Sequence, residues 1–196
     1  MRAVYLVRHG SHDEVGRVLS GRSTIALNDT GRGEAARLAV RLSAVPIARV
    51  ETSPRPRAQE TAAILAESHG LKVDIVDALD EIDFGAWTGR DFADLDDDPA
   101  WHLWNAERGR AATPGGETMG AAVMRARRHL DALDRDGAKG AVLCVSHCDV
   151  IRGVVASYLG LDLDRMLGFD CDPASLTTIA LEDGGARLVA LNERAA

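Results

Sequence analysis

The first third of the chain alternates short apolar runs with segments in which apolar residues recur at helical spacing. The run Ala3–Val7 predicts a buried strand, and the charged triplet Arg8-His9-Gly10 ends it. A helix should follow a polar loop, with Asn28 or a neighbour as its N-cap. Further elements complete a βαβαβ pattern, namely a strand at Ala48–Thr52, a helix at Arg57–His69 and a strand at Lys72–Val76. This pattern predicts a mostly parallel sheet with helices on its faces.

The pattern changes between Phe84 and about Asp136, where the sequence offers no strand candidate. Tryptophans, an acidic run and the interruption at Pro114–Gly116 characterise this segment, and its last long helix is expected at Glu117–Asp134. A buried strand at Ala141–Ser146 then resumes the sheet, and another helix follows it. We therefore expect a helical segment inserted between two parts of one sheet.

The last part of the chain predicts a β-hairpin, with strands at Ser175–Leu181 and Ala186–Leu191 and a turn at Glu182–Gly185. A chain of 196 residues fits one domain around one core. We expect this division of the chain: a single domain over 1–196, with its core at about 1–82 and 137–196 and a helical insertion at about 83–136.

Charge and composition narrow the choice of partners. The formal net charge of −7 repels anions, so a bound phosphate needs a local cluster of cations, and nucleic acid is not an expected partner. No long apolar stretch predicts a signal peptide or a membrane span. The cysteines Cys144, Cys148 and Cys171 form no C-x-x-C pair and leave an odd one, which favours a reducing compartment. We expect a cytoplasmic protein that begins near Met1.

Two histidines follow buried strands of the predicted sheet, His9 after the first and His147 after Ala141–Ser146. Ligands of open α/β sheets bind beyond the carboxyl ends of the strands, so the fold can bring these histidines together. A neutral imidazole is a competent nucleophile when its other ring nitrogen donates a hydrogen bond to a carbonyl. His9, held at a strand end, suits the attack on a phosphate ester.

Breaking a phosphate ester also requires cations around the phosphoryl oxygens and an acid for the leaving oxygen. Arg8 and Arg57 can bind phosphoryl oxygens in bidentate fashion, and His147 adds a donor if it is protonated. Glu81 follows the third strand, where a dianionic substrate would raise its pKa and keep it protonated. It is the candidate general acid, although a carboxylate beside arginines is also a common ion-pair partner.

The sequence at this point resembles the histidine phosphatase superfamily, which includes cofactor-dependent phosphoglycerate mutases and many small phosphatases. The matching segments run nearly from end to end: Leu6–Gly10, Leu27 with Gly31, Ser53–Ala62, Glu81 with Phe84–Gly89, Pro114–Thr118 and Val145–His147. The resemblance implies an α/β three-layer sandwich with a mostly parallel central sheet, helices on both faces and a small helical insertion over the active site. It implies that His9 is phosphorylated, that Arg8, Arg57 and His147 bind the phosphate, and that Glu81 donates the proton, without a metal or another cofactor.

Departures from the family pattern bear on the substrate. Mutases of the family carry an acidic residue and then an asparagine after R-H-G, where this chain has Ser11–Val15, and they carry a longer insertion than Ile82–Thr113. We expect hydrolysis of a small phosphorylated metabolite rather than phosphoryl exchange. Cys148 stands where a glycine is usual and keeps its backbone N–H for the substrate. A loose match to a substrate-contact loop adds three further candidate ligands, Ser20, Gly21 and Arg22.

Other readings stay open at this stage. The protein could be a phosphoglycerate-type mutase, or a phosphate-binding regulatory module without turnover. Arg22 and His12 fit a surface position as well as a ligand, and Trp101 and Trp104 fit helix packing as well as a roof over the pocket. The remaining histidines, His69, His102 and His129, are expected to be solvated on helices. A homodimer is compatible with the sequence, although no clear exposed apolar stripe supports it.

Overall fold

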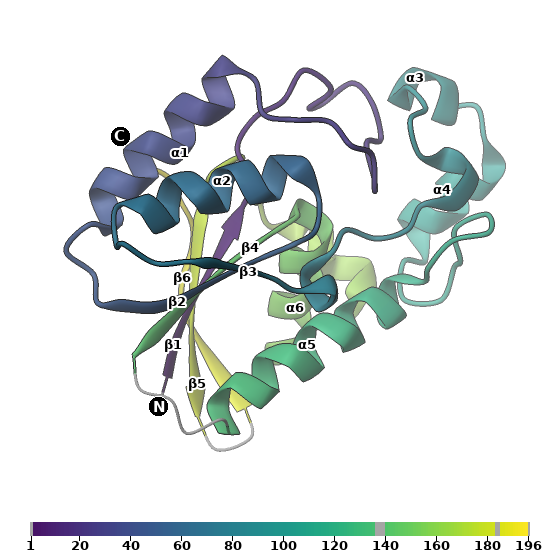
Figure 1. Cartoon of the computed structure of the whole chain (residues 1–196). Coiled ribbons are helices and arrows are strands. Elements are labelled where there is room, and N and C mark those ends of the chain that lie inside the picture. Colours follow the sequence, from purple (N-terminus) through teal and green to yellow (C-terminus); the bar gives the residue numbers. More distant parts are fainter. Residues whose placement is uncertain (1, 136–139, 183–184, 196) are drawn as a thin grey trace.

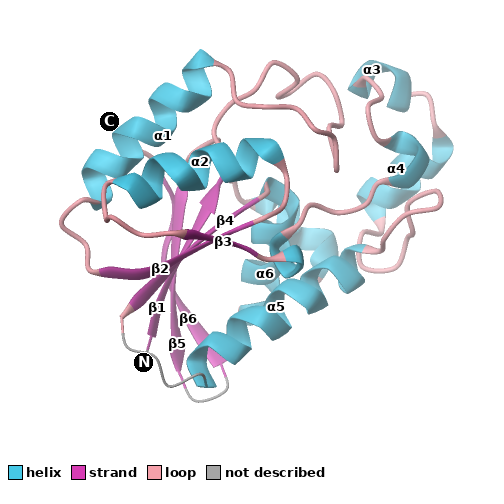
Figure 2. Cartoon of the chain, viewed as in Figure 1, coloured by secondary structure: helices cyan, strands magenta, loops and turns pink. Residues whose placement is uncertain are grey.

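The computed structural model describes residues 2–135, 140–182 and 185–195. A sheet of six strands in the order β3-β2-β4-β1-β5-β6 forms its centre (Figure 2). The first four strands of that order run parallel to one another, whereas β5 is antiparallel to both β1 and β6. The strands are β1 (Arg2–Arg8), β2 (Ile47–Thr52), β3 (Val73–Ile75), β4 (Ala141–Ser146), β5 (Leu176–Glu182) and β6 (Gly185–Glu193).

Helices cover both faces of the sheet, with α1 and α2 on one face and α5 and α6 on the other (Figure 1). The α-helices are α1 (Asp29–Leu42), α2 (Pro56–Glu67), α3 (Phe92–Leu95), α4 (Pro99–Ala106), α5 (Met119–Arg135) and α6 (Cys148–Tyr158). Short 3₁₀ helices are η1 (Asp77–Leu79), η2 (Gly85–Trp87) and η3 (Leu163–Gly168). The expected three-layer α/β fold with a mostly parallel sheet is confirmed.

Apolar spacing on the helices explains these two layers. On one face, Leu38 of α1 and Leu65 of α2 pack with Val50 and Leu143 of the sheet. β4 is buried at every position, as expected of a strand that is covered by helices on both faces. None of the helices in the described ranges is long and apolar enough to cross a membrane.

Most predicted elements match the observed ones to within a few residues. Asn28 caps α1, its side chain accepting a hydrogen bond from the Gly31 amide, as the sequence predicts. The predicted long helix begins at Met119 rather than at Glu117, because Thr118 caps it, its side-chain oxygen accepting a hydrogen bond from the Ala121 amide. Two predicted features, the centre of the turn at 183–184 and the boundary of the insertion at 136–137, lie outside the described residues.

The sheet places two strand ends side by side. Arg8 of β1 pairs with Ser146 of β4, and the amide of His9 donates a hydrogen bond to the Ser146 carbonyl at 3.0 Å. Because β1 and β4 are parallel neighbours, His9 and His147 leave the sheet at the same edge. The site is built around this edge.

Candidate active site

His9 is held as a neutral imidazole with a defined tautomer. Its Nδ1 atom lies 2.8 Å from the Gly10 carbonyl oxygen, and only a protonated nitrogen can donate to that acceptor. The Nε2 atom therefore carries the lone pair. The ring is 3% exposed, and its burial, together with the nearby charges of Arg57 and Arg8, lowers the pKa of His9 well below the ordinary value. The residue has the form that a nucleophile requires.

Arg57, in the first turn of α2, joins the two histidines. Its Nε donates to His9 Nε2 at 3.2 Å, and its Nη2 lies 3.1 Å from His147 Nδ1 and donates to the Gly21 carbonyl at 2.6 Å. The side chain is almost completely buried, and this burial lowers the pKa of its guanidinium, against the opposing charges of Glu81 and Asp80. A guanidinium remains charged under these conditions, so Arg57 brings a fixed positive charge to the centre of the site.

His147 lies on the other side of Arg57, with its ring centroid 5.2 Å from that of His9. Its Nδ1 accepts from Arg57, so the proton resides on Nε2, which lies 2.7 Å from the Ser53 hydroxyl. Burial and then the charge of Arg57 lower the pKa of His147 well below the ordinary value. The sequence analysis allowed a protonated His147, but the structure holds it neutral. A bound phosphate dianion would raise its pKa again.

Arg8 and Cys148 occupy one wall of the cavity. Arg8 Nη1 donates to the Cys171 carbonyl at 2.7 Å, while its buried Nε has no hydrogen-bond partner. The Cys148 thiol donates to the same carbonyl at 3.5 Å. Arg8 thus offers an uncommitted donor edge next to His9, which suits a phosphoryl oxygen.

Glu81 is a carboxyl group that the structure keeps protonated near neutral pH. Burial, followed by the negative charge of Asp149, raises the pKa of Glu81 to about 8. Its Oε2 lies 3.7 Å from His147 Nδ1, and its Oε1 accepts from the Ile82 amide at 3.0 Å. The sequence analysis expected the substrate to raise this pKa, whereas burial in the protein already does so.

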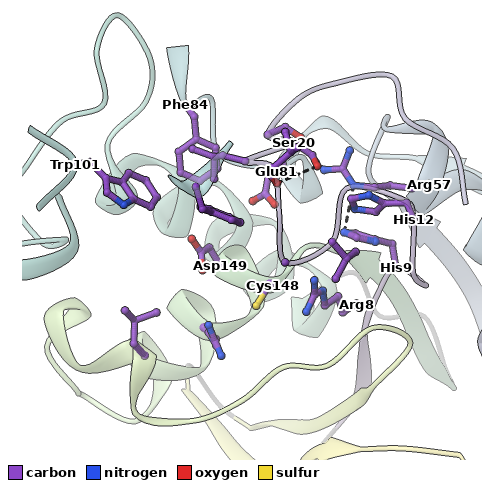
Figure 3. A pocket seen from close by; sticks show the side chains of 18 of the residues that line it. Arg8, His9, His12, Ser20, Arg57, Glu81, Phe84, Trp101, Cys148 and Asp149 are labelled. Carbon is purple, nitrogen blue, oxygen red and sulfur yellow. Dashed lines mark hydrogen bonds between the residues drawn. The ribbon is translucent and has the colours of Figure 1, made fainter. Parts of the chain in front are cut away.

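His9, Arg57, Arg8, Cys148 and Glu81 line one cavity of about 360 Å³, whereas His147 is fully buried and reaches it only through its contacts with Arg57 and Glu81 (Figure 3). Phe84 and Trp101 line its side away from His9 and Arg8, so the cavity has a polar end and a largely apolar end. Trp101 therefore lines the pocket, while Trp104 is fully buried in the core. Of the two interpretations of the tryptophan pair, lining of the pocket holds for Trp101 and packing in the core holds for Trp104.

The structure divides the substrate-loop candidates. Ser20 and Gly21 line the cavity, but Arg22 does not. Its guanidinium instead pairs with Asp80, Asp83 and Glu117, at 3.3, 3.6 and 3.1 Å. Glu117 also binds Arg125 at 2.9 Å.

His12, which the sequence left open, lines the cavity with its ring centroid 5.2 Å from that of His9. Burial and the charges of Arg57 and Arg8 lower the pKa of His12 to about 4, so the ring is neutral at pH 7. The solvated position predicted for His129 is wrong. Its Nε2 lies 2.6 Å from a carboxylate oxygen of Glu51, a buried residue of β2. The periodicity of a helix does not show which strand residue lies next to it, so the contact of His129 with Glu51 could not be predicted.

Four residues of the site were not predicted from the sequence: Ser53, Asp149 and two pocket-lining arginines, Arg108 and Arg152. Ser53 lies within a matched motif, and Asp149 follows His147 by two residues, so proximity to a predicted strand end could have identified both. Arg108 and Arg152 lie on a connecting segment and on a helix face, where nothing in the sequence points to a cavity.

The acidic run Asp94–Asp98 has a local role. Asp98 caps α4 by accepting from the Ala100 amide, and it accepts from the Trp87 indole at 3.0 Å. Over the described ranges, no three His, Cys, Asp or Glu side chains are grouped in a way that could hold a metal ion.

Comparisons with known proteins agree with this geometry. The chain is 30% identical over 195 residues to adenosylcobalamin/alpha-ribazole phosphatase of Salmonella typhimurium, covering 98% of this chain and 96% of the relative. It is 29% identical to phosphoserine phosphatase 1 of Hydrogenobacter thermophilus, with 98% and 92% covered. A solved structure of a mycobacterial glucosyl-3-phosphoglycerate phosphatase with VO3 superposes with a TM-score of 0.90, at 28% identity over 98% of this chain and 99% of that one.

The family model of the histidine phosphatase superfamily (branch 1) matches residues 4–194. This match includes both strand ends that carry the histidines, the arginine at the start of α2 and the buried carboxyl group. The chain belongs to the histidine phosphatase superfamily.

Proposed function

We propose that this protein is a phosphatase that hydrolyses a small phosphomonoester through a phosphohistidine on Nε2 of His9. The observation that carries the proposal is the state of His9: the Gly10 carbonyl holds the proton on Nδ1, so the lone pair is on Nε2, next to Arg57 in the arginine-lined cavity. A nucleophile of this kind divides a difficult hydrolysis into two easier steps.

In the first step, Nε2 of His9 forms a bond to phosphorus while the ester P–O bond breaks. The electron pair leaves with the alcohol oxygen, and the Glu81 carboxyl group transfers its proton to that oxygen. In the second step, the Glu81 carboxylate takes a proton from water as the water oxygen bonds to phosphorus. The P–N bond then breaks, its electron pair returns to Nε2, and inorganic phosphate leaves with His9 and Glu81 restored.

Arginines and the second histidine stabilise the transferring group in this proposal. Arg57 contacts both rings, and the Nε of Arg8, which has no hydrogen-bond partner in the structure, adds a further donor. Phosphoryl transfer depends mainly on such positioning and charge stabilisation. Next to a phosphate dianion, His147 takes up a proton and becomes a further donor, while Ser53 orients its ring.

The relatives support a small phosphorylated metabolite as the substrate, since their names are adenosylcobalamin/alpha-ribazole phosphatase, phosphoserine phosphatase 1 and glucosyl-3-phosphoglycerate phosphatase. A cytoplasmic location, favoured by the free cysteines, and a homodimer remain predictions.

The alternative activity is that of a mutase, which would convert a phosphoglycerate without net release of phosphate. Product analysis with 3-phosphoglycerate separates the two activities, and we expect stoichiometric phosphate.

The test uses p-nitrophenyl phosphate and purified full-length protein. His9→Ala should abolish phosphate release, while the control His102→Ala, on an exposed face of α4, should retain it. Circular dichroism confirms that both variants are folded. Phosphate release by His9→Ala at the wild-type rate would reject the proposal.

A further inference from the structure

Arg152 of α6 lines the same cavity but has no role in the steps above. Its side chain is only 17% exposed, and its buried Nε atom has no hydrogen-bond partner. Its Nη2 lies 3.5 Å from Asp170, whose side chain is 81% exposed. Such a long pair with a solvated carboxylate contributes little, so one donor edge of Arg152 is almost uncommitted.

Other cations of the cavity are more fully engaged. Arg108 donates from Nη1 to Asp149 and from Nη2 to Asn105, both at 2.8 Å, and its guanidinium lies over the Trp104 ring. Arg57 makes the four contacts that hold the two histidines and the substrate loop. Arg8 adjoins His9 and is held by its hydrogen bond to the Cys171 carbonyl, whereas Arg152, farther along α6, has only the long contact with Asp170.

The helix sets the position of the Arg152 backbone relative to Cys148 and His147. Cys148 is the first residue of α6 and directly follows His147, and Arg152 is one turn later on the same face. Four residues of α-helix rise by about 6 Å. Arg152 therefore lines the cavity one helical turn beyond Cys148, where a group of the substrate other than its phosphate can reach it.

The charge of the lining indicates the nature of that group. Four arginines line the cavity, Arg8, Arg57, Arg108 and Arg152. Of its carboxyl groups, Asp149 is paired with Arg108, and Glu81, with a pKa of about 8, is protonated at neutral pH. The lining histidines are neutral, because burial lowers their pKa values. A phosphate dianion balances Arg8 and Arg57 and leaves Arg152 with only its long, solvated pair to Asp170.

We propose that Arg152 binds a carboxylate on the leaving alcohol, so that the substrate is a phosphomonoester of a small hydroxy acid. The assignment rests on the proposed phosphatase function. One carboxylate supplies the single negative charge that the lining lacks, and the Nε–Nη2 edge of a guanidinium matches its two oxygens in bidentate fashion. Arg152 is then a specificity residue that touches the substrate away from the reacting atoms.

The test compares esters that differ only in this group: phosphoserine with phosphoethanolamine, and 3-phosphoglycerate with glycerol 3-phosphate. Wild-type protein should show a higher kcat/KM for the carboxylate member of each pair. Arg152→Gln should reduce this preference by about tenfold to a hundredfold, mainly through KM for the carboxylate member. Arg152→Lys keeps the positive charge but not the planar guanidinium with its two parallel donors, so this variant should retain part of the preference for the carboxylate ester. Arg165→Gln, an exposed arginine of η3 outside the cavity, is the matched control and should keep the preference.

An equal loss for both members of each pair in Arg152→Gln, or a preference unchanged by the substitution, would overturn the carboxylate assignment alone. Wild-type protein that releases phosphate from none of these esters, nor from p-nitrophenyl phosphate, would overturn the phosphatase function and the assignment with it. The two failures are therefore distinguishable.

Discussion

The Nε atom of Arg57 lies 3.2 Å from the Nε2 atom of His9, the nitrogen that attacks phosphorus in the proposed mechanism. In the absence of substrate the Nε2 lone pair accepts this hydrogen bond, and a phosphoryl group has to take the place of the Arg57 donor before Nε2 can attack phosphorus. Because its charge lowers the pKa of His9, Arg57 also keeps the nucleophile available in mildly acidic solution. One arginine thus has an electrostatic role before the substrate binds and a second role in binding the phosphoryl group.

Replacing Arg57 tests both roles. We expect Arg57→Met to lower kcat/KM by about a hundredfold to a thousandfold, the usual cost of losing a preorganised donor to transition-state charge. The acidic limb of the pH–rate profile should also move to higher pH, since removal of the charge raises the pKa of His9. The control Arg37→Met removes an exposed arginine of α1 and should leave both parameters as in the wild type. A normal kcat/KM in Arg57→Met would contradict the assignment.

The pKa of Glu81 should set the alkaline limb of the plot of kcat/KM against pH. The acid must be protonated, so kcat/KM should fall as pH rises through the pKa of Glu81, about 8. Asp149→Asn should move this limb to lower pH, because the negative charge of Asp149 raises that pKa. Glu81→Gln should abolish the limb and slow alkyl esters far more than p-nitrophenyl phosphate, whose leaving group needs no acid. Profiles from pH 5 to 10 check these shifts, and an unmoved limb in Asp149→Asn would assign the limb to another group.

Gly31 tests how the loop after His9 is supported. A Cβ atom at this position of α1 would lie 2.0 Å from the Ser11 carbonyl oxygen, where the loop rests on the helix. We expect Gly31→Ala to lower the free energy of unfolding by about 1–3 kcal/mol and to reduce kcat by displacing His9. Gly33→Ala is the matched control in the same helix, because its nearest neighbour would be a flexible Arg37 side chain at 3.5 Å. Thermal melts and steady-state rates measure both effects, and equal behaviour of the two variants would refute this account of the loop.

Glu51 makes stability depend on pH. Burial opposes its ionisation, but the hydrogen bond and charge of His129, together with Arg49, outweigh burial and lower the pKa of Glu51 below the ordinary value of 4.5. The stabilisation is therefore present above pH 4.5 and is lost as pH falls through the folded-state pKa. Glu51→Gln should lower the free energy of unfolding at pH 7 by about 1–3 kcal/mol and flatten its decline in acid. Urea titrations at several pH values test this prediction. If the free energy of unfolding of the variant declines in acid as steeply as that of the wild type, groups other than Glu51 cause the decline.

The sequence predicted most of the fold because its apolar runs are short and its capping and turn signals are clear, as at Asn28 and at the strand ends before His9 and His147. It also identified the residues that converge at the phosphate end, since parallel strands present their carboxyl ends at one edge. It could not place Arg22 or Arg152. Whether an arginine faces a cavity or pairs with carboxylates depends on packing between distant segments, such as Arg22 with Glu117. The buried pair of His129 and Glu51 was hidden for the same reason.

The most direct test of the central claim is to trap the phosphorylated enzyme. Wild-type protein would be mixed with a rapidly cleaved ester, quenched within milliseconds in alkali, in which phosphohistidine survives, and mapped by peptide mass spectrometry. The account predicts one phosphoryl group on His9, formed and lost at rates consistent with turnover and absent from His9→Ala. Turnover without any phosphorylated His9, or a phosphoryl group on another residue that forms and decays at the turnover rate, would contradict it.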